Sequence, residues 1–301
     1  MQLKNEAAPC HAAQSGCASE GDWARDGFLI LRRAVSADQI ERWTTALDAL
    51  HGRFVAGAIP NLSQDKESAT VFPPHWEWID PAWPRDRIAF RRWRIVEDDP
   101  IFLEAVDHPS WMPILLSLFG PYLQVSLTHA VVYPPDAHDP PYLHVDGGDA
   151  LGQMRIAGDG PPLSVKAMIF LTDLAERDCG NFSVVPGSHR LAFDPAAAER
   201  ARRDSLVQLE VRAGDVVLFP HCLWHGPAPN RSPRSRKTLF IGYSPTFLRP
   251  YDYERIDDAT LARATPRQRR LLGDLGGWAW RAGCHFYAGP DQAEVIGATA
   301  V

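Results

Sequence analysis

The feature that most limits the possible fold is a series of short β-forming runs between Leu123 and Pro245. The runs are LQVSLTHAVVY (123–133), SVKAMIFLTDL (164–174), NFSVVPGS (181–188), GDVVLFPHCLWHG (214–226) and RKTLFIGYSP (236–245). Gly, Pro, Asn and Asp turns separate them, and only the stretch from about Pro195 to Ser205 has a helical pattern. Short strands with few intervening helices are typical of an antiparallel sandwich or barrel.

Helices are expected on both sides of this β region in the chain. Ser36 precedes an amphipathic pattern and has Gln39 at capping-box spacing, with the apolar positions 40, 43, 47 and 50 on one face. Residues 98–119 also predict helix, interrupted at Pro109 and Pro113, and a further helix is expected over 258–272. The run FLIL near Gly27 predicts one more strand. The chain is therefore expected to be mainly β with flanking helices.

Length and composition indicate a globular protein. With 301 residues, 45% hydrophobic and 23% charged, the chain can bury a full core. A net charge of −6 gives no general attraction for nucleic acid or acidic membranes, and no stretch reaches ~18 apolar residues. The five cysteines are scattered and odd in number, which favours a reducing compartment. We expect a cytoplasmic protein with a flexible tail over 1–20 and one domain over 21–301.

The first candidate for chemistry is the pair His144 and Asp146. Residues i and i+2 of a strand point to the same face, so both side chains can reach one metal ion. A pair alone leaves an ion underligated, and roughly one His-x-Asp arises by chance in a chain of this composition. The pair His75 and Glu77 has the same spacing and is interpreted as having no such role. Without a third ligand, a loop or capping role is the better interpretation.

Two histidines compete for the third ligand position. His225 lies at the end of the run 214–226, just before Gly226, and His221 lies four residues earlier, on the same face of a strand. Spacing alone does not choose between them. Arg236 begins the next β-run, where a guanidinium near the metal can hold a carboxylate by a two-pronged hydrogen bond. An alternative is a solvated charge beside Arg231 and Arg234.

The ordered motifs of the chain resemble those of the phytanoyl-CoA dioxygenase family. They are His144-Val145-Asp146, the segment NFSVVPGSHR (181–190), Gly214-Asp215-Val216-Val217, His225-Gly226 and Arg236. The Pro-Gly-Ser-His segment between the two metal motifs makes the resemblance far more specific than His-x-Asp alone. It covers the chain from about Gly27 to about Pro245.

This resemblance implies a double-stranded β-helix, also called a jelly-roll or cupin-like fold, and an oxygenase site. It implies Fe(II) held by His144, Asp146 and His225, with 2-oxoglutarate held by Arg236 and decarboxylated to succinate and CO2 as O2 is consumed. Family members often carry Ser two residues after the second His, whereas this chain has Pro227. Thr238 and Lys166 are candidates to replace that contact, and His189 is expected to be a packing residue.

The substrate is expected to be a small molecule, with hydroxylation the commonest outcome and desaturation, cyclisation or epimerisation as alternatives. A lid is expected over 52–94, dense in Pro and Trp, where Trp76 and Trp78 would contact an apolar or cyclic compound. Arg155 and Lys166 are candidates to meet an acid group. The other divisions are a core over 123–245 and a helical segment over 246–301. We expect a monomer or homodimer without nucleic-acid or membrane partners. The competing hypothesis is a jelly-roll binding protein without catalysis or with another metal.

Overall fold

The computed structural model describes residues 19–59, 84–136, 142–147, 162–279 and 287–297. Three of the expected substrate contacts, Trp76, Trp78 and Arg155, lie outside these residues, as do most of the expected lid and of the N-terminal tail. The division of the chain into tail, core, lid and helical segment stays a prediction.

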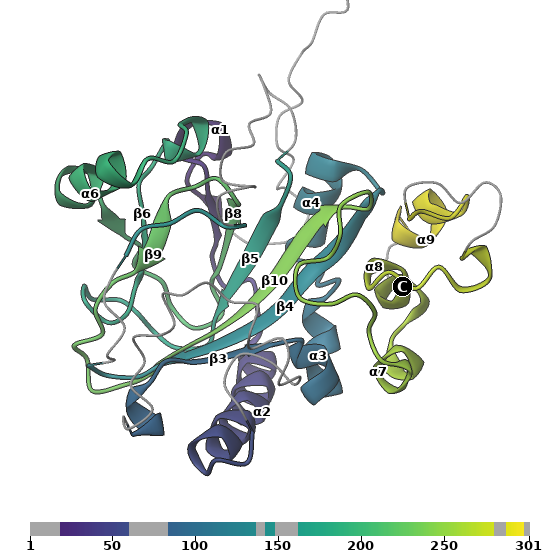
Figure 1. The fold of residues 1–301 in the computed structure, drawn as a ribbon, viewed down its shortest axis with the longest axis horizontal. Helices are drawn as coiled ribbons and strands as arrows, with labels where there is room; N and C mark the ends of the chain where they lie inside the picture. Colours follow the sequence, from purple (N-terminus) through teal and green to yellow (C-terminus); the bar gives the residue numbers. More distant parts are fainter. Residues whose placement is uncertain (1–18, 60–83, 137–141, 148–161, 280–286, 298–301) are drawn as a thin grey trace, which may run out of the picture.

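The architecture is built on two antiparallel sheets (Figure 1). The larger has the strand order β1-β2-β8-β5-β10-β4-β3, and the smaller has the order β7-β6-β9. The larger sheet contains β1 (Ser19–Glu20), β2 (Leu29–Leu31), β3 (Phe90–Trp93), β4 (Leu123–Tyr133), β5 (Val165–Phe170), β8 (Val216–Pro220) and β10 (Arg236–Pro245). The smaller contains β6 (Phe182–Val184), β7 (Val207–Gln208) and β9 (His225–Pro227).

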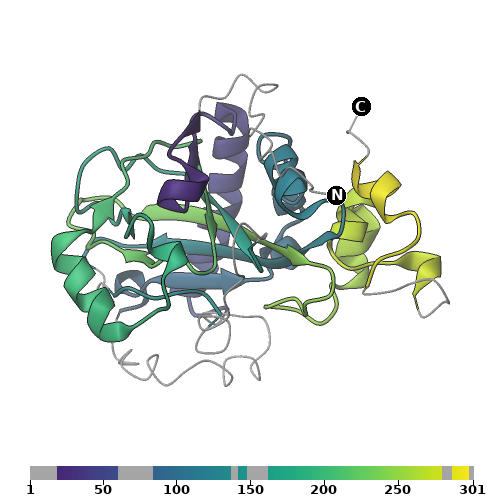
Figure 2. The ribbon, with the colours of Figure 1, turned by 90° about the horizontal axis from the view of Figure 1, so that it is seen from above.

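Helices cover one face of the larger sheet. In Figure 2 the helices α2 (Ala37–Val55) and α4 (Met112–Phe119) lie on the same side of it. Two short helical turns, α3 (Ile95–Asp98) and η4 (Pro100–Ala105), pack into the same cluster as these helices. Ser36 and Gln39 form the expected capping box at the start of α2, which satisfies amide groups that have no partner within the helix.

The remaining helical elements lie around the sandwich. They are α1 (Trp23–Asp26), η3 (Arg85–Arg87), η5 (Ser188–Arg190), α6 (Pro195–Asp204), α7 (Asp258–Arg263), α8 (Pro266–Leu271), η6 (Gly276–Trp278) and α9 (Gln292–Gly297). The helices α7, α8 and α9 form a group beside one edge of the sandwich (Figure 1). Within the described ranges, no helix combines the length and apolar character that crossing a membrane requires.

Alternation along the strands separates the two largest clusters of the core. On β8, Val216 and Leu218 belong to the cluster between sheet and helices, while Val217 and Phe219 belong to the cluster between the two sheets. The same alternation on β10 places Leu239 and Ile241 in the helix-side cluster. Its other face, which carries Arg236 and Phe240, lines a cavity between the sheets. One face of β10 therefore packs against the helices, and the other face lines the cavity.

Most sequence expectations for the elements are confirmed, with three corrections. The run 214–226 is two strands, because β8 ends at Pro220 and the chain turns before β9 joins the smaller sheet. Pro113 does not interrupt a helix as expected, because it lies in the first turn of α4. The expected helix over 258–272 is broken into α7 and α8, where Thr265 caps the second helix and Pro266 begins it.

Candidate metal centre

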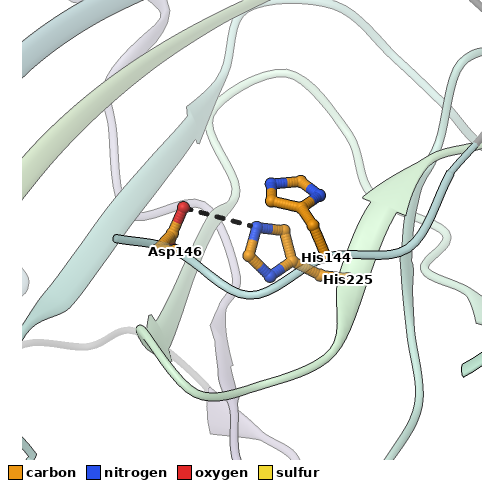
Figure 3. Close-up of side chains that lie close together, drawn as sticks. All are labelled: His144, Asp146 and His225. Carbon is orange, nitrogen blue, oxygen red and sulfur yellow. Dashed lines mark ion pairs between the residues drawn. The ribbon is translucent and has the colours of Figure 1, made fainter. Parts of the chain in front are cut away.

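Three side chains that could hold a metal ion meet at one end of the space between the sheets. His144, Asp146 and His225 each offer one ligand atom, and these atoms lie within 4.8 Å of one another (Figure 3). His225 is the first residue of β9, whereas His144 lies outside the named strands in an isolated bridge to it. The strand predicted around His144 is therefore only a single bridged pair of residues, His144 and His225. The side chains of His144 and Asp146 nevertheless point to the same side, as they would on a strand.

Backbone hydrogen bonds fix this arrangement. The amide of His144 donates to the carbonyl of His225 at 2.9 Å, and the amide of His225 donates back at 3.0 Å. The amide of Asp146 donates to the carbonyl of His221 at 2.9 Å. A Cβ at Gly226 would overlap the carbonyl oxygen of Tyr142, so a glycine here is required for the two segments to approach.

The ring of His225 is held by one hydrogen bond and two aromatic neighbours. Its Nδ1 lies 2.8 Å from the carbonyl oxygen of Leu223, and the rings of Phe182 and Phe219 lie 5.3 and 4.9 Å away. Because a carbonyl can only accept, Nδ1 carries the proton of the neutral ring and Nε2 keeps a lone pair. That Nε2 lies 3.8 Å from Oδ1 of Asp146.

The charge states at the centre suit a cation. Burial, followed by the neighbouring His225, lowers the pKa of His144 well below its usual range. Burial also lowers the pKa of His225, although Asp146 opposes this. Burial acts to raise the pKa of Asp146, but Lys166 and, after it, the two histidines together outweigh burial, so the pKa is lowered. Two neutral imidazoles and an ionised carboxylate are the protonation states that metal binding needs.

Lys166 lies on this carboxylate. Its Nζ is 2.5 Å from Oδ1 of Asp146, and the lysine side chain is 17% exposed. The sequence suggested Lys166 as a contact for 2-oxoglutarate or for an acid group of the substrate. The structure places it beside Asp146, where its charge offsets that of the carboxylate, and also in the lining of the cavity described below. Its contact with 2-oxoglutarate or substrate stays a prediction.

Unsatisfied atoms mark the same place. Nδ1 of His144 and Oδ2 of Asp146 are buried and have no hydrogen-bond partner. Buried polar groups without a partner are rare in proteins, and binding of an ion is one of the reasons for them. The donor set and its unsatisfied atoms therefore fit a metal ion.

His221 has a different position from the one its spacing suggested. It lies in the turn between β8 and β9, is 4% exposed, and contributes its backbone carbonyl to Asp146. The group of metal-binding side chains found in the described residues does not include it. His189 packs against Gly27 beside α1, away from this group.

The centre opens into a cavity of about 710 Å³. Arg236 lines it at 6% exposure, and its Nη1 donates to the carbonyl of Gly180 at 2.8 Å. Its guanidinium carbon lies 5.1 Å from the centre of the Tyr133 ring. Thr238, two residues further along the same face of β10, is fully buried, and its Oγ1 has no partner. Pro227 also lines the cavity.

Other residues line the cavity that the sequence did not single out. They are Arg91 and Trp93 on β3, His129 on β4, and Tyr251 after β10. The letters of FRRW do not alternate between apolar and polar, so only the structure, in which the second and fourth residues are less buried than the first and third, separates Arg91 and Trp93 from their neighbours. For Tyr251, which follows the last strand without a pattern of its own, the sequence offers no signal either.

The chain is similar in sequence to known dioxygenases. The model of the family described as phytanoyl-CoA dioxygenase (PhyH) matches residues 23–238. The dioxygenase FUM3 of Gibberella moniliformis is 26% identical over 141 residues, which cover 46% of this chain and 45% of that protein. The dioxygenase olcK of Penicillium canescens is 27% identical over 176 residues, 56% of each. The chain spans about half the length of these relatives.

Solved structures show the same fold. HygX from Streptomyces hygroscopicus, with nickel and 2-oxoglutarate bound, has a TM-score of 0.56 and 23% identity, covering 78% of this chain and 88% of that one. SnoK, a non-haem α-ketoglutarate-dependent carbocyclase from nogalamycin biosynthesis, has a TM-score of 0.53 and 21% identity, covering 81% and 88%. This likeness confirms the expected jelly-roll core.

Proposed function

We propose that this chain, which belongs to the phytanoyl-CoA dioxygenase family, is an Fe(II)- and 2-oxoglutarate-dependent dioxygenase that oxidises a small organic molecule. The observation that carries the proposal is the meeting of His144, Asp146 and His225 with two of their buried atoms unsatisfied. Two imidazoles and one carboxylate with open positions are the ligand set of non-haem Fe(II) oxygenases. When bound, the iron and its cosubstrate would supply the oxidising power, as 2-oxoglutarate loses CO2 and becomes succinate.

The protein's own part begins with orientation of the ligands. The Leu223 carbonyl holds the His225 ring so that Nε2 is available, and Lys166 holds one oxygen of Asp146. Such outer contacts fix ligand geometry and raise affinity for the metal. Because the donor set found among the described residues has three members, positions on the ion would stay open for cosubstrate and O2.

Arg236 is proposed to hold the distal carboxylate of 2-oxoglutarate. Its buried guanidinium lines the cavity and is backed by Tyr133, so it offers a planar, charged donor to a carboxylate. The unsatisfied hydroxyl of Thr238 on the same strand face supplies a second donor. Lys166 is assigned to Asp146 instead, so Thr238 is the better candidate to replace the serine that Pro227 displaces.

The substrate and product are also proposals. Relatives named as dioxygenases, and a HygX structure with hygromycin B bound, support a small-molecule substrate. We propose hydroxylation, with succinate and CO2 as coproducts, and a monomer or homodimer in solution. The apolar walls of the cavity, which include Met168, Phe182 and Phe240, would keep water from the reacting centre.

The test measures binding and turnover separately. Fe(II) and 2-oxoglutarate added without O2 are expected to give a visible charge-transfer absorption in the wild type and none in His225→Ala. Admission of O2 is expected to yield succinate, measured by NMR, at a rate that substrate raises. A wild-type protein that binds neither iron nor 2-oxoglutarate would refute the proposal.

A further inference from the structure

The contact between Lys166 and Asp146 divides the cavity into two parts along β10. Lys166 pairs with Gly242 of β10, and its side chain contacts Asp146 of the candidate metal centre. Arg236 lies six residues before Gly242 on the same face of the strand, and Ser244 lies two residues after it. Because 2-oxoglutarate is assigned to the Arg236 side, the Ser244 side of the cavity is available to the substrate.

Three serines line the Ser244 side of the cavity. Ser126 is on β4, Ser164 lies just before β5, and Ser244 is on β10; they are called the serine group below. The strands β5, β10 and β4 are neighbours in the larger sheet, with β10 in the middle (Figure 1). Ser126 and Ser244 are buried, and Ser164 is partly exposed. Hydroxyl groups from three neighbouring segments therefore gather at one end of the cavity.

A β-bulge turns Ser126 toward the cavity. The pairing of β4 with β10 shifts between Gly242 and Tyr243, which leaves Ser126 without a partner residue in this ladder. Consecutive residues of a regular strand point to opposite faces, yet Ser126 and Leu127 both line the cavity. Gly242 leaves room for this arrangement, because a Cβ there would lie 2.8 Å from Oγ of Ser126. Bulges are common beside active sites, where they redirect a side chain.

Backbone hydrogen bonds hold the serine group in place. The carbonyl of Ser126 accepts from the amide of Tyr251 at 2.6 Å, and the carbonyl of Ser164 accepts from the amide of His221 at 3.0 Å. Ser244 lies within the ladder of β10, opposite Gln124 of β4. Groups that are positioned before a ligand arrives reduce the entropy that is lost on binding.

The hydroxyl of Ser244 has no hydrogen-bond partner within the protein. Its Oγ is buried and unsatisfied, and the residue is 3% exposed. A serine hydroxyl can both donate and accept a hydrogen bond. Because burial of a hydroxyl without a partner destabilises a protein, such a group at the wall of a cavity points to a ligand that supplies the partner.

The charged side chains of the described lining lie mainly elsewhere in the cavity. They are Arg91, Lys166, Arg236, Arg249 and Asp146. Arg91 lies on the Arg236 side, since it pairs with Val131, which in turn pairs with Thr238. Arg249 follows Ser244 in the chain, but it is 83% exposed and pairs with Glu254, and exposed ion pairs contribute little.

The Ser244 side of the described lining therefore combines hydroxyl groups with apolar surface and contains no buried charge. Its apolar members are Leu127, Leu163 and Leu248. A charged ligand group placed here would lose its hydration without gaining a partner of opposite charge, whereas a neutral oxygen needs only a hydrogen bond. The lining thus favours an uncharged ligand.

We infer that the substrate is an uncharged molecule with an apolar skeleton, whose hydroxyl or carbonyl oxygen hydrogen-bonds to Ser244 and the other members of the serine group. The inference rests on the proposed function, since 2-oxoglutarate is assigned to the other part of the same cavity. Ser244 and Ser126 determine specificity for the substrate, whereas the metal ligands and Arg236 hold the ion and the cosubstrate.

Equilibrium dialysis of the full chain against 2-naphthol and 2-methylnaphthalene tests this inference. The two probes have nearly the same size, and a methyl group replaces the hydroxyl in the second. Ni²⁺ and saturating 2-oxoglutarate are present, so that the Arg236 side is occupied. Ser244→Ala should weaken the binding of 2-naphthol about fivefold, as expected for one neutral hydrogen bond, and that of 2-methylnaphthalene less than about twofold. Adding Ser126→Ala should lower only the affinity for 2-naphthol further.

Ser183→Ala is the matched control. The hydroxyl of Ser183 on β6 is also buried without a partner, but Ser183 does not line the cavity. This variant should leave both affinities unchanged. Thermal denaturation adds a second measurement, because Ser244→Ala removes a hydroxyl that has no partner in the protein and should keep or raise the melting temperature. A lower melting temperature with equal losses for both probes would show a structural role and overturn the inference.

Naphthalene-2-carboxylate tests whether the ligand is uncharged. It should bind at least about fivefold more weakly than 2-naphthol, because its charge would lose hydration beside the serine group. Tighter binding of the carboxylate would overturn the inference, as would the absence of 2-naphthol binding up to its solubility limit.

The same experiments separate the inference from the proposed function. A protein that binds iron and 2-oxoglutarate, but in which Ser244→Ala leaves the affinity for 2-naphthol unchanged, would refute the inference alone. Binding of 2-naphthol that depends on Ser244, in a protein that binds neither iron nor 2-oxoglutarate, would refute the proposed function and support the serine group as a binding site.

Discussion

The two faces of β10 differ in how their polar groups are satisfied. On the helix side, Tyr243 is fully buried, accepts from Trp111 Nε1 at 2.9 Å and donates to the Val106 carbonyl at 2.9 Å. On the cavity side, the hydroxyl of Thr238 is equally buried and has no partner. A polar group that stabilises the fold has its hydrogen-bond partner within the protein, whereas a group that binds a ligand gains its partner when the ligand binds. The face with complete hydrogen bonds should therefore govern stability, and the other should govern binding.

The largest expected effect is on the cavity side, at His225. Replacement by Ala removes a proposed ligand, so turnover should be abolished and metal affinity should fall by more than the 10–100-fold typical of outer-contact mutations. His221→Ala is the control, because the contact of His221 to Asp146 runs through its backbone. Metal titration of both variants measures the two affinities. A larger loss of metal affinity in His221→Ala than in His225→Ala would show that His221, and not His225, is the third ligand.

The opposite effect is expected at Ile241, fully buried on the helix side of the same strand. Ile241→Ala should lower the free energy of unfolding by about 2–5 kcal/mol, through lost burial and the cavity that remains. The folded fraction should bind metal with unchanged affinity. Chemical denaturation combined with metal titration measures both, and a large fall in affinity would break the division between the faces.

Gly226 affects both the fold and metal binding, since it is a structural residue within the candidate metal centre. A methyl group there conflicts with the Tyr142 carbonyl, so Gly226→Ala should shift the segment that carries His144 and lower metal affinity by about 10–100-fold. Gly52→Ala in α2 meets nothing within 4 Å and should stabilise the protein by about 0.5–1 kcal/mol. If the two variants bind metal equally well, the close approach at Gly226 is not needed for the site.

Arg236→Lys sharpens the assignment of the cosubstrate. Lysine keeps the charge but loses the planar fork, so the KM for 2-oxoglutarate should rise by about one to two orders of magnitude, in line with roughly 1.5–3 kcal/mol for a hydrogen bond to a charged group. Metal affinity should not change. An unaltered KM would remove Arg236 from the site and direct attention to Arg231 or Arg234.

The smallest effect concerns Asp252, whose carboxylate accepts a hydrogen bond from the amide of Thr128 and so ties the chain after β10 to β4. Burial raises its pKa to about 7 from an ordinary value of 3.8. Between these values the folded protein holds a proton that the unfolded chain has released, so stability falls as pH rises, by at most ~1.4 kcal/mol per pH unit. Denaturation between pH 5 and 6.5 should show this slope in the wild type relative to Asp252→Asn.

The relevant quantity is the difference in the free energy of unfolding between the wild type and Asp252→Asn, because other groups titrate in the same pH range. Burial lowers the pKa of His108 to about 4, which gives a slope of opposite sign that both proteins share. Identical pH profiles for the wild type and Asp252→Asn would show that Asp252 is ionised in the folded protein.

The sequence predicted the regular elements and the identity of the clustered side chains better than it predicted how they meet. β-forming residues and the turn residues around them identified β4 and β10 with their observed bounds, because both signals are local in the sequence. The break at Pro220 was missed, since a run of apolar residues does not show when a chain crosses to a second sheet. The contacts of Lys166 with Asp146 and of Tyr251 with Trp93 join segments that are distant in the sequence, and such contacts have no local signal.

The bridge between His144 and His225 also ties ligand binding to folding. These residues are far apart in the sequence and meet only when β9 has joined the smaller sheet, so partly folded chains do not present the site. An ion that binds only the native state stabilises it by mass action, in proportion to the logarithm of its free concentration. The melting temperature of this protein should therefore depend on metal supply, and a cell short of iron would hold a less durable form of the same chain.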